Sequence, residues 1–259
     1  MSPWSKTVLS FIFLAVFIYL GIGTLLYTFQ RSFIYFPVAD YEHSYDTEKF
    51  EINDVVITAI VLNKGNDNAV IYFGGNAEAV VGEADSFART LPDHTVYLIN
   101  YRGYADSTGN PTEAGLYADA EKLYDILSAR HKSVSAIGRS LGTGVATYLA
   151  SVRELNKVIL VTPFDSIQRI AQEIYPVYPM SLLLQDKYDS LGRIDSIDSP
   201  VLVIVANQDS IVPSESTQRL IDAFPPGQIQ VYVIEGAGHN TVSLTNKYYQ
   251  VISQYLDEM

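Results

Sequence analysis

Three side chains in this sequence could together carry out nucleophilic chemistry: Ser140, Asp209 and His239. A serine hydroxyl becomes a useful nucleophile when a neutral imidazole accepts its proton, and a carboxylate beside the imidazole fixes its tautomer. Ser140 lies in the segment Gly138-Arg139-Ser140-Leu141-Gly142. The pattern G-x-S-x-G is short enough to arise by chance. Its meaning therefore depends on the elements that position the three residues.

Short apolar, β-branched runs alternate with helix-like segments along most of the chain. Strands are predicted at 54–62, 68–73, 95–100, 134–138, 157–162, 201–206 and 229–234. Helices are predicted at 78–91, 113–130, 141–153, 214–223 and 241–256. The middle strands are almost continuously apolar, which is typical of strands covered on both faces. The alternation predicts an α/β fold with a mostly parallel central sheet and helices on both faces.

The three candidate residues each follow a separate predicted strand, in the order Ser140, Asp209, His239. In a parallel sheet, ligands bind beyond the carboxyl ends of the strands. Serine, acid and histidine in this order match the order of an α/β-hydrolase triad. Asp165, which follows strand 157–162 in the segment "TPFDSI", is the alternative acid.

The first part of the chain contains a long uncharged run. Residues 7–30 lie between Lys6 and Arg31, and the core of this run, Val8 to Tyr27, can span about 30 Å as a helix. A cleaved signal peptide is the alternative, but the run is long for one and no A-x-A-like cleavage site follows. We expect a retained single-pass membrane helix. The flanking charges favour a cytoplasmic N-terminus, with the rest of the chain on the extracytoplasmic side.

The composition excludes several classes of protein. The chain has 29 acidic and 17 basic residues, a formal net charge of −12, which argues against a nucleic-acid partner and against a basic membrane-binding surface. It has no cysteine, so disulfides, thiolate metal ligands and cysteine nucleophiles are excluded. Its four histidines do not cluster at metal-binding spacings, and we expect neither a metal nor a cofactor.

The segment Asn100–Ala120, "NYRGYADSTGNPTEAGLYADA", is the most specific motif in the chain. Together with the 138–142 segment and the later stretches "DKYDSLGRIDSIDSPVLVIVANQDSIVP" and "EGAGHN", it resembles the α/β-hydrolase family over about residues 31–259. The resemblance narrows to a subgroup of membrane-anchored serine hydrolases that includes lysophospholipases and protein depalmitoylases. Part of this region of the family has aminopeptidase-like similarity instead.

The resemblance implies a domain organisation and a role for each candidate residue. Residues 1–31 would be the membrane anchor and 32–259 the catalytic domain, with a short cap at about 164–199. Ser140 would be the nucleophile, His239 the base, and Asp209 the acid that orients it.

The oxyanion hole would consist of the backbone N–H groups of Leu141 and Asn76, with Gly75 or Ala77 as alternatives to Asn76. Two positions depart from the family pattern. Gly74 stands where a histidine is frequent, and Ala105 stands where a glycine is usual. The apolar stretch 175–184 is interpreted either as an acyl-binding lid or as a helix packed on the core.

The expected activity is that of a membrane-anchored serine hydrolase that cleaves acyl esters or thioesters through an acyl-enzyme. Its partners would be the membrane and a small acyl substrate, and the anchor and apolar cap favour a lipid-like one. A serine peptidase is one alternative, and it should have acidic residues placed to bind a substrate amine. A non-catalytic binding domain is another, and it should have a broken triad.

Overall fold

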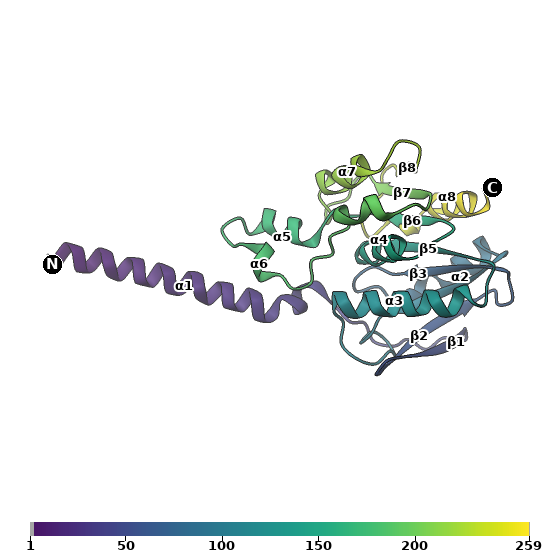
Figure 1. The fold of residues 1–259 in the computed structure, drawn as a ribbon, viewed down its shortest axis with the longest axis horizontal. Coiled ribbons are helices and arrows are strands. Elements are labelled where there is room, and N and C mark those ends of the chain that lie inside the picture. Colours follow the sequence, from purple (N-terminus) through teal and green to yellow (C-terminus); the bar gives the residue numbers. More distant parts are fainter. Residues whose placement is uncertain (1–2, 259) are drawn as a thin grey trace.

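An eight-stranded sheet forms the centre of the computed structural model, which describes residues 3–258 (Figure 1). The strands are β1 (Asp46–Ile52), β2 (Val55–Leu62), β3 (Asn68–Phe73), β4 (His94–Asn100), β5 (Ser133–Arg139), β6 (Val158–Val161), β7 (Val201–Ala206) and β8 (Ile229–Ile234). The helices are α1 (Pro3–Ile34), α2 (Ala84–Thr90), α3 (Glu113–Ser128), α4 (Leu141–Val152), α5 (Ile167–Ile174), α6 (Met180–Leu183), α7 (Ser214–Ala223) and α8 (Asn246–Asp257). Short 3-10 helices occur at η1 (Val80–Glu83), η2 (Leu191–Ser196) and η3 (Val242–Leu244).

The strand order is β1-β2-β4-β3-β5-β6-β7-β8, and the six strands from β3 to β8 pair in parallel. Alternate side chains of each buried strand enter two separate apolar cores, because successive residues of a strand face opposite sides. Tyr97 and Ile99 of β4 belong to the core beneath α3 and α4. Val96 and Leu98 belong to the core beneath α2 and α8. The predicted α/β fold with helices on both faces of a mostly parallel sheet is confirmed.

Some elements differ from the prediction. The sequence analysis missed β1, an edge strand that pairs antiparallel with β2. Its sequence, "DTEKFEI", is mostly charged, and only Phe50 and Ile52 are buried. Charged residues are usual on an edge strand, so its apolar signal is weak. The predicted helices 78–91 and 241–256 are each divided into a 3-10 turn and an α-helix.

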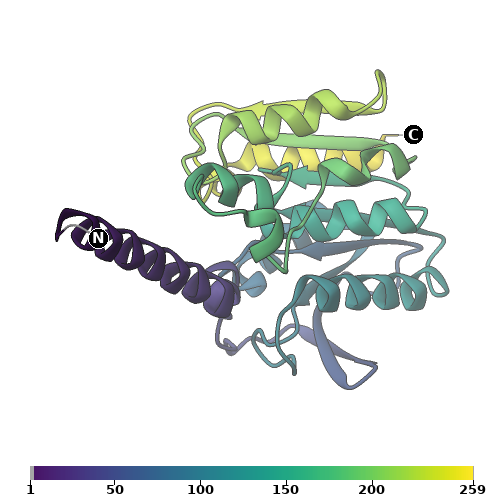
Figure 2. The same cartoon turned by 60° about the vertical axis from the view of Figure 1, so that its left-hand side comes forward.

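The helix α1 projects away from the sheet, and α5 and α6 lie near its second half (Figures 1 and 2). Within residues 3–258 it is the one helix long and apolar enough to cross a membrane, from Trp4 to Ile34. It is longer than the uncharged run that predicted it, because the helix continues on both sides of that run.

Candidate active site

Ser140 lies in the sharp turn between β5 and α4, which we name the elbow (residues 138–142). Its backbone φ of 49° and ψ of −116° are unusual for a residue with a side chain. The turn is held by a hydrogen bond from the Ser140 N–H to the carbonyl of Val161 on β6, at 2.9 Å. A strained backbone at a strand–helix junction is the geometry that exposes a nucleophilic hydroxyl.

The glycines of the elbow are required by close backbone contacts. A Cβ added at Gly138 would lie 2.3 Å from the carbonyl oxygen of Gly142. A Cβ added at Gly142 would lie 2.0 Å from the carbonyl oxygen of Phe73, at the end of β3. The two glycines therefore let α4 start directly against the strands on either side of the elbow.

The structure brings Ser140, His239 and Asp209 together in one chain of hydrogen bonds. The Ser140 Oγ lies 2.8 Å from Nε2 of His239, and Nδ1 of His239 lies 2.7 Å from Oδ2 of Asp209. Both His239 and Asp209 are largely buried, with 7% and 12% of their side-chain surfaces exposed. If Nδ1 carries the ring proton, Nε2 is free to accept the proton of the serine hydroxyl.

The Asp209 carboxylate is kept ionised by its surroundings. Burial alone would raise its pKa, but hydrogen bonds from His239 and from the N–H groups of Val212 and Ile211 outweigh that effect and lower it. Those two backbone groups bind Oδ1 at 2.9 and 2.8 Å, which leaves Oδ2 for the imidazole. The carboxylate is thus both fixed in orientation and charged.

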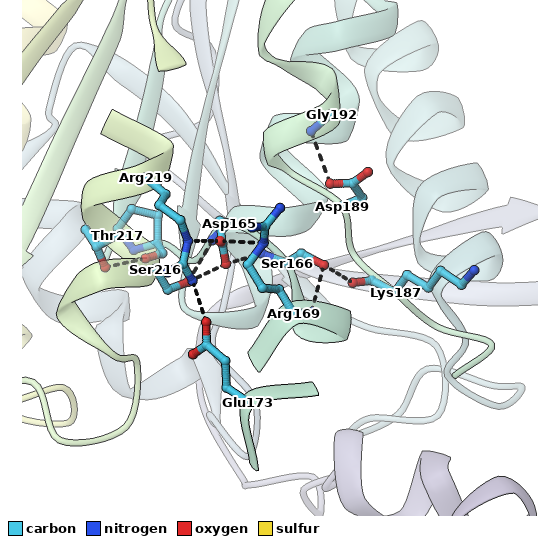
Figure 3. A network of polar contacts seen from close by, with 11 residues as sticks. Asp165, Ser166, Arg169, Glu173, Lys187, Asp189, Gly192, Ser216, Thr217 and Arg219 are labelled. Atoms are coloured by element: carbon cyan, nitrogen blue, oxygen red, sulfur yellow. Dashed lines mark hydrogen bonds and ion pairs between the residues drawn. The ribbon is translucent and has the colours of Figure 1, made fainter. Parts of the chain in front are cut away.

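Asp165, the alternative acid, belongs to a different network (Figure 3). Its side chain is fully buried, and its Oδ2 accepts a hydrogen bond of 2.6 Å from Nε of Arg219 and lies 3.2 Å from Nε of Arg169. Its Oδ1 accepts a hydrogen bond of 2.6 Å from the Ser216 hydroxyl. Both of its oxygens are used in joining β6, α5 and α7, and neither contacts His239.

The loop after β3 supplies a free backbone donor near Ser140. A Cβ built on Gly75 would lie 3.6 Å from Cβ of Ser140, so this loop passes next to the hydroxyl. The Gly75 N–H is already bound to Glu78 at 2.6 Å, and the Ala77 N–H to Oδ1 of Asn76 at 3.1 Å. The N–H groups of Asn76 and Leu141 donate to no other residue of the described chain, 3–258.

The same loop is braced without the histidine that is frequent in the family at Gly74. The Tyr101 hydroxyl donates to the Gly74 carbonyl at 2.7 Å. Glu78 accepts from the Gly75 N–H and, through its other oxygen, from the Tyr72 hydroxyl at 2.6 Å. The sequence analysis assigned Glu78 and Tyr101 no role, because neither has a recognisable spacing to the serine.

A buried ion pair lies beneath the loop. The Arg139 guanidinium is 3.3 Å from Glu78 and 3.4 Å from Glu83. Burial lowers the pKa of Arg139, but the two carboxylates and neighbouring tyrosine oxygens outweigh it and raise the pKa, so the guanidinium stays charged. Arg139 directly precedes Ser140, and its ion pairs join the elbow to the loop.

Asn76 also contacts the end of α1 through its side chain. Its Nδ2 donates to the Ile34 carbonyl at 2.7 Å, and its Oδ1 accepts from the Phe36 N–H at 2.9 Å and from the Tyr104 hydroxyl at 2.8 Å. Ala105, the second departure from the family pattern, has a φ of 47° and donates its N–H to Val38. A left-handed backbone explains why glycine suits this position.

Two known proteins are similar to this chain over most of its length. No family model matches the chain. An uncharacterised protein of Mycobacterium tuberculosis is 33% identical over 240 residues, which cover 86% of this chain and 85% of that protein. The alpha/beta hydrolase domain-containing protein 17C of Xenopus tropicalis is 29% identical over 199 residues, which cover 74% of this chain and 62% of that protein.

A solved structure shares the fold. An esterase of Pyrococcus furiosus superposes with a TM-score of 0.64 at 18% identity, covering 86% of this chain and 95% of that one. The parallel strands and the turn between β5 and α4 have the arrangement that such folds share. The chain therefore has the α/β-hydrolase fold.

Proposed function

We propose that this protein is a membrane-anchored serine hydrolase that cleaves acyl esters or thioesters through an acyl-enzyme. The observation that carries the proposal is the unbroken chain of hydrogen bonds from Ser140 through His239 to Asp209. It contains the nucleophile, the base and the orienting acid that acyl transfer requires. Asp165 is not available for the role of acid, because its carboxylate is bound by Arg219 and Ser216.

Each half of the reaction would use His239 to move one proton. As the Ser140 Oγ attacks the acyl carbon, Nε2 of His239 accepts the hydroxyl proton, and Asp209 stabilises the imidazolium. When the tetrahedral intermediate collapses, the bond to the leaving alcohol or thiol breaks, and the leaving group takes that proton. A water molecule then attacks the acyl-enzyme, gives its proton to His239, and the proton returns to Ser140 as the carboxylic acid leaves.

The oxyanion would be bound by the backbone N–H groups of Leu141 and Asn76. Leu141 begins α4, where the first N–H groups of a helix have no partner within the helix. The Asn76 N–H is preferred over those of Gly75 and Ala77, because both of these already have acceptors. Each such donor is worth about 3–4 kcal/mol to the transition state.

The proposed domain organisation keeps the sequence-based boundaries. Residues 1–31 are the anchor, 32–259 the catalytic domain, and about 164–199 the cap. The apolar stretch of α1 supports the anchor. The cap includes α5 and α6, which pack on each other and lie beside α1 rather than over the sheet (Figure 1).

Turnover of matched chromogenic substrates tests the proposal. The full-length protein in detergent should hydrolyse p-nitrophenyl butyrate and a butyryl thioester, and should leave an alanine p-nitroanilide intact. Ser140→Ala should abolish the hydrolysis. Ser133→Ala, at the start of the same strand, is the matched control and should keep it. Cleavage of the anilide alone would favour a peptidase, and no turnover of any substrate by the folded protein would favour a binding domain.

A further inference from the structure

Eleven consecutive residues of the cap, 174–184 ("IYPVYPMSLLL"), carry no charge, and they lie along α1. The rings of Tyr178 and Tyr19 stack with their centroids 4.6 Å apart, and the Tyr19 hydroxyl donates to the Val177 carbonyl at 2.9 Å. Nearer the domain, Gln30 donates to the Leu183 carbonyl at 3.1 Å. The cap therefore follows α1 from Tyr19 to Gln30.

The length of α1 determines the depth of these contacts in a bilayer. Crossing the hydrocarbon requires about 20 apolar residues. A span of about 20 residues that begins at Thr7, directly after Lys6, ends at Leu26. The part of α1 that precedes the first cap contact, Thr7 to Ile18, is about 18 Å long, against a hydrocarbon thickness of about 30 Å. If α1 crosses the membrane, the contact at Tyr19 lies within the hydrocarbon.

The surface of the cap fits that depth. Four of its apolar side chains are exposed: Ile174 (63%), Tyr175 (44%), Val177 (69%) and Leu182 (80%). An exposed apolar cluster of this kind is unusual on a monomer in water and marks a surface that contacts a partner or a membrane. It adjoins the exposed apolar surface of α1 and contains no charge, so the partner that suits both surfaces is lipid.

An apolar pocket of about 260 Å³ lies between α1, α5 and α6. Its walls include Phe33 of α1, Ile170 and Ala171 of α5, and Met180 of α6. The polar atoms of Gln30, which also lines it, are satisfied by backbone groups. Apart from Gln30 and the Tyr175 hydroxyl, the side chains of the lining are apolar and uncharged, which matches an unbranched hydrocarbon chain.

One wall of the pocket is joined by a hydrogen bond to the loop beside the candidate nucleophile. Ile34 lines the pocket, and its carbonyl accepts the hydrogen bond from Asn76 in the loop that passes next to Ser140. We infer that segment 174–184 inserts into the leaflet beside α1, and that the pocket takes one acyl chain of a bilayer lipid. The ester or thioester of that lipid is then presented to Ser140, an inference that rests on the proposed function.

The first test measures depth and does not depend on catalysis. Because the chain has no cysteine, Leu182→Cys provides a single site for the environment-sensitive dye NBD. In phosphatidylcholine nanodiscs, its emission should shift to the blue and be quenched by lipids with a nitroxide on the acyl chain. The matched control is Val152→Cys, an exposed apolar residue at the far end of α4. An equal, water-like emission from both sites would overturn the insertion of the cap.

The second test maps the acyl chain directly. A phosphatidylcholine with a diazirine on one acyl chain should crosslink to the α5 and α6 residues that line the pocket. Ala171→Phe fills the pocket and should abolish these crosslinks, while Ser181→Phe, outside the lining, should keep them. Crosslinks confined to exposed residues such as Leu182, and equal in both variants, would overturn the acyl site. Since crosslinking needs no turnover, a failure of the hydrolase proposal alone would leave this pattern unchanged.

Discussion

The Asn76 side chain donates a 2.7 Å hydrogen bond to the carbonyl of Ile34, the last residue of α1. The same amide accepts the N–H of Phe36, so Ile34 and Phe36 are both fixed to the loop that carries a proposed oxyanion donor. Between them, the Tyr35 hydroxyl contacts that of buried Tyr188 at 2.9 Å. The end of α1 is therefore part of the site's support, although most of the helix projects away from it.

Two truncations should separate this support from membrane anchoring. A chain that starts at Ser32 keeps Ile34 and Phe36, and its kcat on p-nitrophenyl butyrate in detergent should stay within about threefold of the full-length value. A chain that starts at Tyr41 loses Ile34 and Phe36 and leaves the Asn76 side chain with Tyr104 and the adjacent N–H of Ala77, and its kcat should fall by about tenfold or more, because a displaced oxyanion donor stabilises the transition state less.

The full-length variant Asn76→Ala should show the same loss in kcat with little change in KM. Asn63→Ala is the matched control, since its amide also joins two backbone groups, the carbonyls of Ala88 and Leu91, but far from Ser140. It should lower the melting temperature without changing kcat. Equal kcat values for the two truncations, or for Asn76→Ala and wild type, would show that α1 does not support the site.

Substitution of the two aspartates should give opposite effects. Asp209→Asn should lower turnover by about 10⁴-fold, because the amide favours the wrong imidazole tautomer, and should lower the melting temperature less than Asp165→Asn does. Asp165→Asn should lower the free energy of unfolding by about 3 kcal/mol, because it leaves the charge of Arg219 without its buried partner, and should lower kcat only slightly. A reversed pattern in kinetics and thermal unfolding would move the acid to Asp165.

The pH dependence of the unfolding free energy should show the ionisation of Asp209. Its pKa is lowered in the folded protein, against an unfolded value of about 3.9. A depressed carboxyl pKa contributes stability above the unfolded pKa, and that contribution disappears as the pH falls through the folded pKa. The difference in unfolding free energy between wild type and Asp209→Asn should therefore be constant from pH 5 to 7 and shrink below about pH 4. Urea titrations would measure it, and a difference that grows as the pH falls would contradict the assignment.

The effect of adding a Cβ at an elbow glycine can be compared with the same change at a glycine in open space. Gly142→Ala would place a Cβ 2.0 Å from the Phe73 carbonyl oxygen, and we expect it to lower the free energy of unfolding by about 3 kcal/mol or more. Gly82→Ala, where no atom lies within 4 Å of the added Cβ, should change it by less than about 1 kcal/mol. Thermal unfolding of both variants is the measurement, and an equal effect would show that the close approach at Gly142 can relax.

The sequence was sufficient to predict the parts of the fold that depend on continuous apolar runs. Strands β3 to β7 are buried on both faces, and the strand order places Ser140, Asp209 and His239 after β5, β7 and β8, at one edge of the sheet. The edge strand β1 was not predicted, because exposed, charged residues give it no such signal. Helices α5 and α6 were not resolved within the predicted cap, because proline-containing "YPVYP" interrupts any helical period.

The contacts that support the site also could not be predicted from the sequence. The contact between Asn76 and Ile34 joins residues that are 42 positions apart, and no sequence motif pairs the two. The exclusion of Gly75 as an oxyanion donor depends on its hydrogen bond to Glu78, which only coordinates show. Such features depend on tertiary geometry, whereas strand order depends on local pattern.

Covalent labelling with a fluorophosphonate tests the central claim most directly, since this probe reacts with activated serines and needs no knowledge of the substrate. The full-length protein in detergent would be labelled, digested, and the modified residue identified by mass spectrometry, with Ser140→Ala and His239→Ala in parallel. Our account predicts one modified residue, Ser140, and no labelling of either variant. Undiminished labelling of Ser140→Ala, or modification at another serine, would contradict it.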